Sequence, residues 1–243
     1  NWLKFAIKYL RQKKGDVVGG PSLPFSNQNY SEKICHLSKR SIFVTGYLNF
    51  RKYKAKKRYC DWLESCNLIM KRNFFLDHNG MDENRYTGED KEFFERAKRK
   101  NHNIKVFYSP DLFVYHRERR FVGFLLQRSC FGMDFLNLTK FNTGLKGFQP
   151  LLPILIFSTF LIILFSEITI FYKINILLSL ILVINLAIFF EVKKYIKSLK
   201  ALFFTIITIN LANIVFALGS FVGILGLRKL LVNKLYSYSR WNN

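Results

Sequence analysis

Two adjacent carboxylates stand out in a chain that is otherwise strongly basic. The 243 residues carry a formal net charge of +22, yet the stretch from Met81 to Asp90 is polar and acidic and ends in Glu89 and Asp90. A positioned carboxylate can act as a general base that removes a proton from an attacking hydroxyl group. The structural alternative is that both residues cap a helix over 89–101, because the helix dipole stabilises carboxylates at its N-terminus.

Hydrophobic periodicity predicts helices and strands in a mixed order around this pair. Gly19-Gly20-Pro21 forces a turn after the first strand. The basic and aromatic segment 47–59 is interpreted as a solvated loop that faces a membrane, with phosphate or lipid head-group contact as the alternative. Helices are expected over 2–13, 31–43, 73–78 and 89–101, and strands over 16–18, 62–70, 104–108 and 112–116.

A further helix is expected over 119–138, directly before the apolar part of the chain. Its large side chains are spaced for a single apolar face, which predicts an interfacial helix lying on a membrane. These side chains are Phe121, Phe124, Leu125, Phe131 and Phe135.

The last third of the chain has the apolar composition of a membrane-embedded region. Three apolar runs, at about 150–172, 174–190 and 201–227, are each near the ~20 residues that a membrane-spanning helix needs. Buried helices of a soluble core are a poor alternative, because too little soluble mass remains to cover three of them. We therefore divide the chain into a soluble domain, 1–149, and a transmembrane region, 150–243.

Charge predicts an orientation for this region, because Lys and Arg collect on the cytoplasmic side of spanning helices. The basic domain and the loop 191–200, which holds four lysines, are expected inside, and the loop at 172–173 outside. The tail from Leu227 then falls outside although it holds Arg228, Lys229, Lys234 and Arg240. Either the third run is re-entrant or the charge bias of the tail is weak.

Composition argues against other classes of protein. Cys35, Cys60, Cys66 and Cys130 show no paired spacing, so neither a disulfide framework nor a metal finger is expected. A nucleic-acid binder would not need three spanning runs, and no nucleic-acid-binding motif is visible. Membrane lipids are the partner that the basic excess and the apolar runs both indicate.

The order of several short motifs resembles the family 2 glycosyltransferases, which are inverting enzymes with a GT-A fold. Each motif alone is weak, whereas their order and spacing over about 15–135 are specific. The motifs are CNLIMKR at 66–72, GMDEN at 80–84, GED at 88–90, IKVFYSPDLFVYH at 104–116 and QRSCFG at 127–132.

The resemblance implies a role for each polar residue in these motifs. Asp90 would be the catalytic base, and Glu89 would help to hold the acceptor or the loop. His116, otherwise a hydrogen-bonded strand end, would reach the donor diphosphate or bind the Mg²⁺ or Mn²⁺ that neutralises it. The remaining candidates for substrate binding are Gln127 and Arg128 near the phosphates, Asp82 at the turn before the GED motif, and Asn67 on the acceptor side.

The expected fold class is α/β: the C-terminal portion of a GT-A nucleotide-diphospho-sugar transferase domain, followed by about three transmembrane helices. The family needs an Asp-x-Asp motif for metal and nucleotide, and none occurs in the 243 residues. We therefore expect the N-terminal nucleotide-binding half to be missing, and the chain by itself to be inactive.

The predicted function is a multi-pass membrane glycosyltransferase with a cytosolic domain. It would transfer a sugar from a nucleotide-sugar donor to a lipid-linked or cell-surface glycan. The alternative is a degenerate, non-enzymatic membrane module that binds a partner or anionic lipid.

Overall fold

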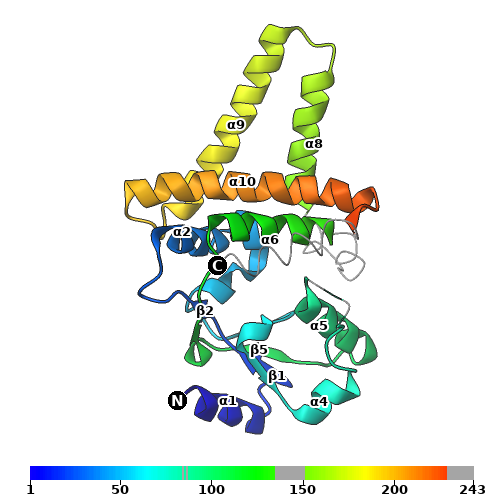
Figure 1. The fold of residues 1–243 in the computed structure, drawn as a ribbon. Coiled ribbons are helices and arrows are strands. Elements are labelled where there is room, and N and C mark those ends of the chain that lie inside the picture. The colour runs from blue at the N-terminus through cyan, green and yellow to red at the C-terminus, as the bar shows by residue number, and fades with distance from the viewer. Residues whose placement is uncertain (84, 86, 135–150, 229–243) are drawn as a thin grey trace.

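A mixed α/β domain is joined to a group of apolar helices in the computed structural model, which describes residues 1–83, 85, 87–134 and 151–228 (Figure 1). On one side a hairpin of α8 (Leu151–Phe165) and α9 (Ile170–Val192) stands away from the α/β domain. Between the hairpin and the domain lie α6 (Phe121–Met133) and α10 (Leu199–Ile224), which pack along each other.

The α/β domain contains a four-stranded sheet in the order β3-β5-β1-β4. The central strand β1 pairs parallel with β5 and antiparallel with β4, and β3 pairs antiparallel with β5. A separate parallel pair joins β2 and β6. The strands are β1 Val17–Gly19, β2 Ser22–Leu23, β3 Arg58–Cys60, β4 Leu68–Met70, β5 Val106–Tyr108 and β6 Val114–Tyr115.

Neighbouring residues of β1 point to opposite faces of the sheet, as strand geometry requires. Val17 packs on one face with the apolar side of α5 (Glu89–Lys100), and Val18 packs on the other face with α1 (Trp2–Arg11). Both valines are fully buried. The sheet therefore lies between α1 and α5, and the position of α5 fixes where the Glu89-Asp90 pair stands.

Several predicted elements are confirmed with small changes in their bounds. The expected helices over 2–13 and 89–101 correspond to α1 and α5, and the expected strands over 104–108 and 112–116 are shortened to β5 and β6. The helix expected over 73–78 is α4 (Arg72–Asp77). The other helical elements are α2 Tyr30–Lys39, α3 Ile42–Thr45, and the 3-10 turns η1 Gly46–Lys52, η2 Ser65–Asn67 and η3 Pro110–Leu112.

Three predicted elements were wrong in part. The helix expected over 31–43 is interrupted, because the Ser41 side chain accepts the Phe43 N–H and starts α3. The strand expected over 62–70 is limited to β4, with η2 before it. The segment 47–59, expected as a solvated loop, forms η1 and part of β3, and it buries Arg51 and Lys52, which are 5% and 6% exposed.

The apolar face of α6, which was predicted to lie on a membrane, is covered in part by other helices. Phe124 is fully buried, and Phe121 and Leu125 pack with residues of α9 and α10 in the same core. Phe131 lines a cavity instead. The last part of the predicted helix 119–138, including Phe135, lies outside the described residues.

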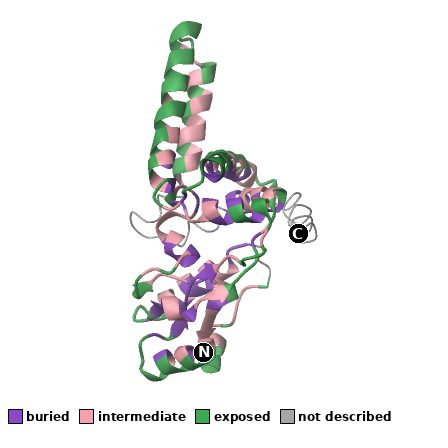
Figure 2. Cartoon of the chain, turned by 90° about the vertical axis from the view of Figure 1, so that its left-hand side faces the viewer, coloured by how far each residue is buried: buried purple, intermediate pink, exposed green. Residues whose placement is uncertain are grey.

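Within the described part of the chain, two helices, α9 with 23 residues and α10 with 26, are long and apolar enough to cross a membrane by length and composition. The described part of α8 is shorter, at 15 residues. The two long helices differ in their surroundings. In the most apolar 18-residue stretch of each helix, 6% of α9 is buried and 44% of α10 is buried. Figure 2 shows the same contrast, with the hairpin exposed along its length.

Asn67, a predicted substrate-binding residue, is placed in the core of the α/β domain. Its side chain is 2% exposed and donates hydrogen bonds to the carbonyl oxygens of Pro21 (3.0 Å) and Leu112 (2.7 Å). Its side-chain oxygen accepts the Trp2 indole N–H at 3.0 Å. The amide thus joins the β2–β6 region to α1 and β4, and we correct its predicted role to a structural one.

Asn67→Ala is expected to lower the free energy of unfolding by about 3 kcal/mol, because two buried carbonyl groups lose their donor. Thermal unfolding in detergent micelles measures this change. Asn73→Ala, at an exposed position on α4, is the control and should be nearly neutral. Equal unfolding temperatures for the two variants would contradict the structural role.

Candidate functional site

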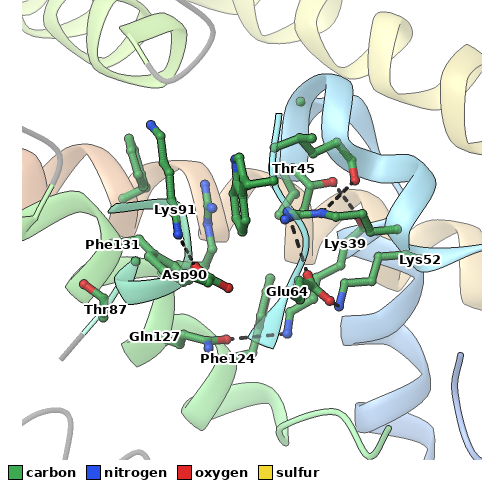
Figure 3. A pocket seen from close by; sticks show the side chains of 18 of the residues that line it. Lys39, Thr45, Lys52, Glu64, Thr87, Asp90, Lys91, Phe124, Gln127 and Phe131 are labelled. Carbon is green, nitrogen blue, oxygen red and sulfur yellow. Dashed lines mark hydrogen bonds and ion pairs between the residues drawn. The ribbon is translucent and has the colours of Figure 1, made fainter. Parts of the chain in front are cut away.

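A cavity of about 450 Å³ lies where the α/β domain meets α6 and the apolar helices. Its polar lining comes from the loop before α5, the 3-10 turn η1 and the segment 62–66. Its apolar lining includes Phe124 and Phe131 of α6, Pro153 of α8 and Phe216 of α10. Figure 3 shows Asp90 with Thr87 and Lys91 on one side of the cavity and Glu64 with Lys39 and Lys52 on the other.

Asp90 stands in the first turn of α5 and lines this cavity. Its carboxylate accepts the backbone N–H of Lys91 at 2.7 Å and that of Ser65 at 3.3 Å. Burial, followed by the charge of the adjacent Glu89, raises the pKa of Asp90 to about 7, and Arg51 opposes the shift only in part. A carboxylate with a pKa near 7 is matched to accepting a proton at neutral pH.

The loop before α5 is held by two local features. Gly88, the residue before the helix, has φ of +70°, a left-handed conformation that glycine adopts without steric cost. The hydroxyl of Thr87, beside it, donates to the carboxylate of Asp134, which is fully buried at the end of α6. These contacts tie the position of the Glu89-Asp90 pair to α6.

A chain of buried ion pairs forms the other side of the cavity. Lys52 Nζ lies 2.9 Å from a Glu64 carboxylate oxygen and 3.7 Å from one of Glu118, and Lys39 Nζ lies 2.6 Å from the second Glu118 oxygen. Burial would raise the pKa of Glu64, but Lys52 and Arg51 hold it at about 2. Burial likewise opposes the ionised form of Glu118, yet Lys39 and Lys52 hold its pKa well below the usual value. These charges are therefore compensated locally.

Arg128 differs from these paired cations. Its guanidinium group lies over the Phe216 ring, 4.8 Å from the ring centroid, and its Nε atom is buried with no hydrogen-bond partner among the described residues. Burial lowers the pKa of Arg128 to about 10, so it stays protonated at neutral pH. Arg128 thus places a positive charge on the apolar side of the cavity.

Five of the seven residues singled out in the sequence come together around the cavity, namely Glu89, Asp90, His116, Gln127 and Arg128. They come from α5, the end of β6 and α6, which are separated in the sequence. Asn67 and Asp82 do not line the cavity. Asp82 lies 3.4 Å from Arg85 in the turn before α5, which agrees with a role in shaping that turn, and its contact with substrate stays a prediction.

The sequence analysis missed the buried ion pairs of Lys39, Arg51, Lys52, Glu64 and Glu118. No motif marks these residues, and Arg51 and Lys52 were assigned to a solvated loop. The sequence offered one weak indication of these ion pairs. Glu64 and Glu118 are acidic residues beside apolar segments in a chain that is otherwise basic.

The described residues do not form a metal site by themselves. Among residues 1–83, 85, 87–134 and 151–228, no group of three His, Cys, Asp or Glu side chains converges so that it could hold a metal ion. His116 lines the cavity, and its backbone N–H donates to the Leu23 carbonyl in the β2–β6 pair. We therefore derive no chemical step through a metal ion.

No protein-family model, curated protein or solved structure matches this chain.

The raised pKa of Asp90 predicts a pH-dependent gain in stability for Asp90→Asn. The pKa is about 7 in the fold against an ordinary value of 3.8, so the carboxylate costs stability increasingly between these pH values and fully above pH 7. We expect the variant to be more stable than the parent by on the order of 2 kcal/mol at pH 8, with the difference vanishing near pH 4.

Thermal unfolding in detergent across this pH range measures the effect without any substrate. Asp77→Asn, at an exposed position, is the matched control and should show no such trend. A pH-independent difference for Asp90→Asn would show that the carboxylate has an ordinary pKa.

Proposed function

We propose that this chain is part of a membrane-bound inverting glycosyltransferase that transfers a sugar from a nucleotide-sugar donor to a lipid-linked acceptor. The single observation that carries the proposal is Asp90, a carboxylate whose pKa is raised to about 7 at a cavity between the α/β domain and the apolar helices. The motif order that resembles family 2 glycosyltransferases gives the same residue the role of the base.

In this mechanism the acceptor hydroxyl oxygen attacks the anomeric carbon from the face opposite the leaving group. The new C–O bond forms while the bond from the anomeric carbon to the nucleoside diphosphate breaks, and its electron pair leaves with the diphosphate. Asp90 takes the hydroxyl proton. Glu89, adjacent to Asp90, disfavours its ionised form and so keeps it a stronger base than an exposed aspartate.

The two walls of the cavity support a lipid-linked acceptor over a soluble glycan. Phe124, Phe131 and Phe216 provide an apolar surface on the side of the membrane helices, and Arg128 stands among them. An amphiphile with an anionic head and a hydrocarbon chain matches this combination, because the chain buries apolar area and the head pairs with the guanidinium group. Gln127, whose side-chain oxygen lies 3.5 Å from Lys39 Nζ at the same cavity, would contact the same head group.

A non-enzymatic membrane module remains the second candidate. The absence of an Asp-x-Asp sequence from the 243 residues favours it, since donor binding in the family uses that motif. Under this hypothesis the cavity binds an anionic lipid without turnover.

Asp90→Asn is expected to lower acceptor-dependent turnover by about 100-fold or more, because the base contributes 10²–10⁴-fold in such reactions. The assay uses membranes from cells that express the complete gene product. It measures the transfer of labelled sugar from a panel of UDP-, GDP- and dTDP-sugars into extractable lipid. Asp77→Asn should retain activity. Turnover in Asp90→Asn equal to that of the parent would show that the base is another residue, and no transfer by the parent would favour the non-enzymatic module.

Arg128→Gln is expected to raise the KM for the lipid acceptor about tenfold and to leave kcat within a few-fold, because the head group loses a charged partner. The matched control is Arg72→Gln, at an exposed position on α4. Thermal unfolding of each variant in parallel separates lost binding from lost packing against Phe216. An unchanged KM in a fully folded Arg128→Gln protein would remove Arg128 from the acceptor site.

A further inference from the structure

The helix α10 is attached to the α/β domain at its N-terminal end. Ala201 and Leu202, in its first turn, are buried in one core with Ile34 and Cys35 of α2. The Phe204 ring meets the Tyr30 ring edge to face, with ring centroids 6.0 Å apart. The beginning of α10 therefore lies against the domain.

The C-terminal end of α10 is attached to the same domain. Arg228, shortly after the helix, forms an ion pair with the buried Asp134, which also accepts the Thr87 hydroxyl of the loop before α5. The last two turns of α10 approach the backbone of α6 closely: a Cβ atom on Gly219 would lie 2.2 Å from the Ser129 carbonyl oxygen, and one on Gly223 would lie 2.4 Å from that of Met133. This end is thus held beside the cavity.

These two attachments conflict with a membrane-spanning α10. Its 26 residues measure about 39 Å at ~1.5 Å per residue, longer than the ~30 Å hydrocarbon core of a bilayer. A spanning helix of that length would place its ends on opposite sides of the membrane. One end of α10 packs on α2 of the α/β domain, and the other end is joined to the same domain through Asp134 and Thr87. In contrast, α9 has only one end near the domain, and Figures 1 and 2 both show α10 running across the foot of the α8–α9 hairpin.

The face of α10 that does not pack on the domain is apolar. Its exposed side chains recur at helical spacing along almost the whole helix and include Phe203, Ile207, Ile214 and Leu218. This surface is continuous with the hairpin, because α10 also contacts α8 and α9.

Basic residues gather where α9 passes into α10. Lys193, Lys194, Lys197 and Lys200 are all exposed there. Anionic lipid head groups attract such residues by about 1 kcal/mol each. An apolar stripe beside a basic cluster is complementary to the surface of an anionic bilayer.

We propose that α10 does not cross the bilayer but lies along its surface on the side of the α/β domain, with its exposed apolar face in the lipid beside the α8–α9 hairpin. By length and composition alone, α10 could cross a membrane. The contacts at its two ends favour a position along the membrane surface. The arrangement places Arg228, where the basic tail begins, on the domain side. That placement removes the conflict with the positive-inside rule. The proposed position of α10 does not depend on glycosyltransferase activity.

A topology assay on the full chain tests this proposal. Reporters are placed after Lys194, within the loop 166–169 and at the C-terminus. We expect the C-terminal reporter to give the same side as the one after Lys194, and the loop reporter to give the opposite side. A C-terminal reporter on the side of the loop would overturn the proposal, because α10 would then span the membrane.

The depth of α10 in the bilayer provides a second test. Nitroxide labels are attached through a genetically encoded residue at Phe203, Ile214 and Leu218, in vesicles of phosphatidylglycerol and phosphatidylcholine. Oxygen and nickel accessibility should give one shallow depth of about 5–10 Å for all three labels. Labels at Leu178, Leu182 and Leu186 of α9 are the controls and should give graded depths.

Two results would overturn the inference. A graded profile with Ile214 near the centre of the bilayer would mean that α10 crosses it. Free access of water to all three α10 labels would mean that lipid does not cover this face.

Discussion

Backbone contact between α6 and α10 is the constraint on which the rest of the structure depends. Gly132 of α6 and Gly219 and Gly223 of α10 have no side chains, and a Cβ atom on any of them would lie within 2.4 Å of a backbone oxygen of the other helix. The two helices therefore pack at a distance that larger residues would prevent, as is common between helices in membranes. Through this contact the apolar helices are fixed to the α/β domain, and the cavity gains an apolar wall.

The cavity carries several buried charges, and their arrangement decides which groups are available for chemistry. Glu64 and Glu118 are each compensated by lysines at short distance, and removing one partner of such a pair leaves a costly uncompensated charge. For Asp90, the charge of Arg51 offsets burial and the charge of Glu89 only in part, so the pKa of Asp90 is raised. Arg128 has no carboxylate partner among the described residues and packs on Phe216. The paired charges stabilise the polar lining of the cavity. Asp90 is therefore the candidate for chemistry there, and Arg128 is the candidate for binding.

Parts of the fold with strong local signals could be predicted from the sequence. The helix that begins with Glu89 and Asp90 follows from its carboxylate-rich start and its buried Phe93, Phe94 and Ala97 at helical spacing. Elements that depend on distant contacts could not be predicted. Arg51 and Lys52 look like residues of a solvated loop, yet Glu64 and Glu118 make their burial tolerable. Asn67 looked like a substrate ligand, but its amide is occupied by backbone groups brought there by the β2–β6 pair.

The sequence by itself determined that the chain combines a mixed α/β domain with apolar helices. It singled out seven polar residues, which include Glu89, Asp90, His116, Gln127 and Arg128. It also determined that the run at about 201–227 is apolar enough for a lipid environment, because hydropathy is a sum over side chains. Only the tertiary structure decided that these five residues share one cavity, since they come from three separate elements. It also decided that both ends of α10 are attached on the side of the α/β domain, because hydropathy does not report contacts between distant residues.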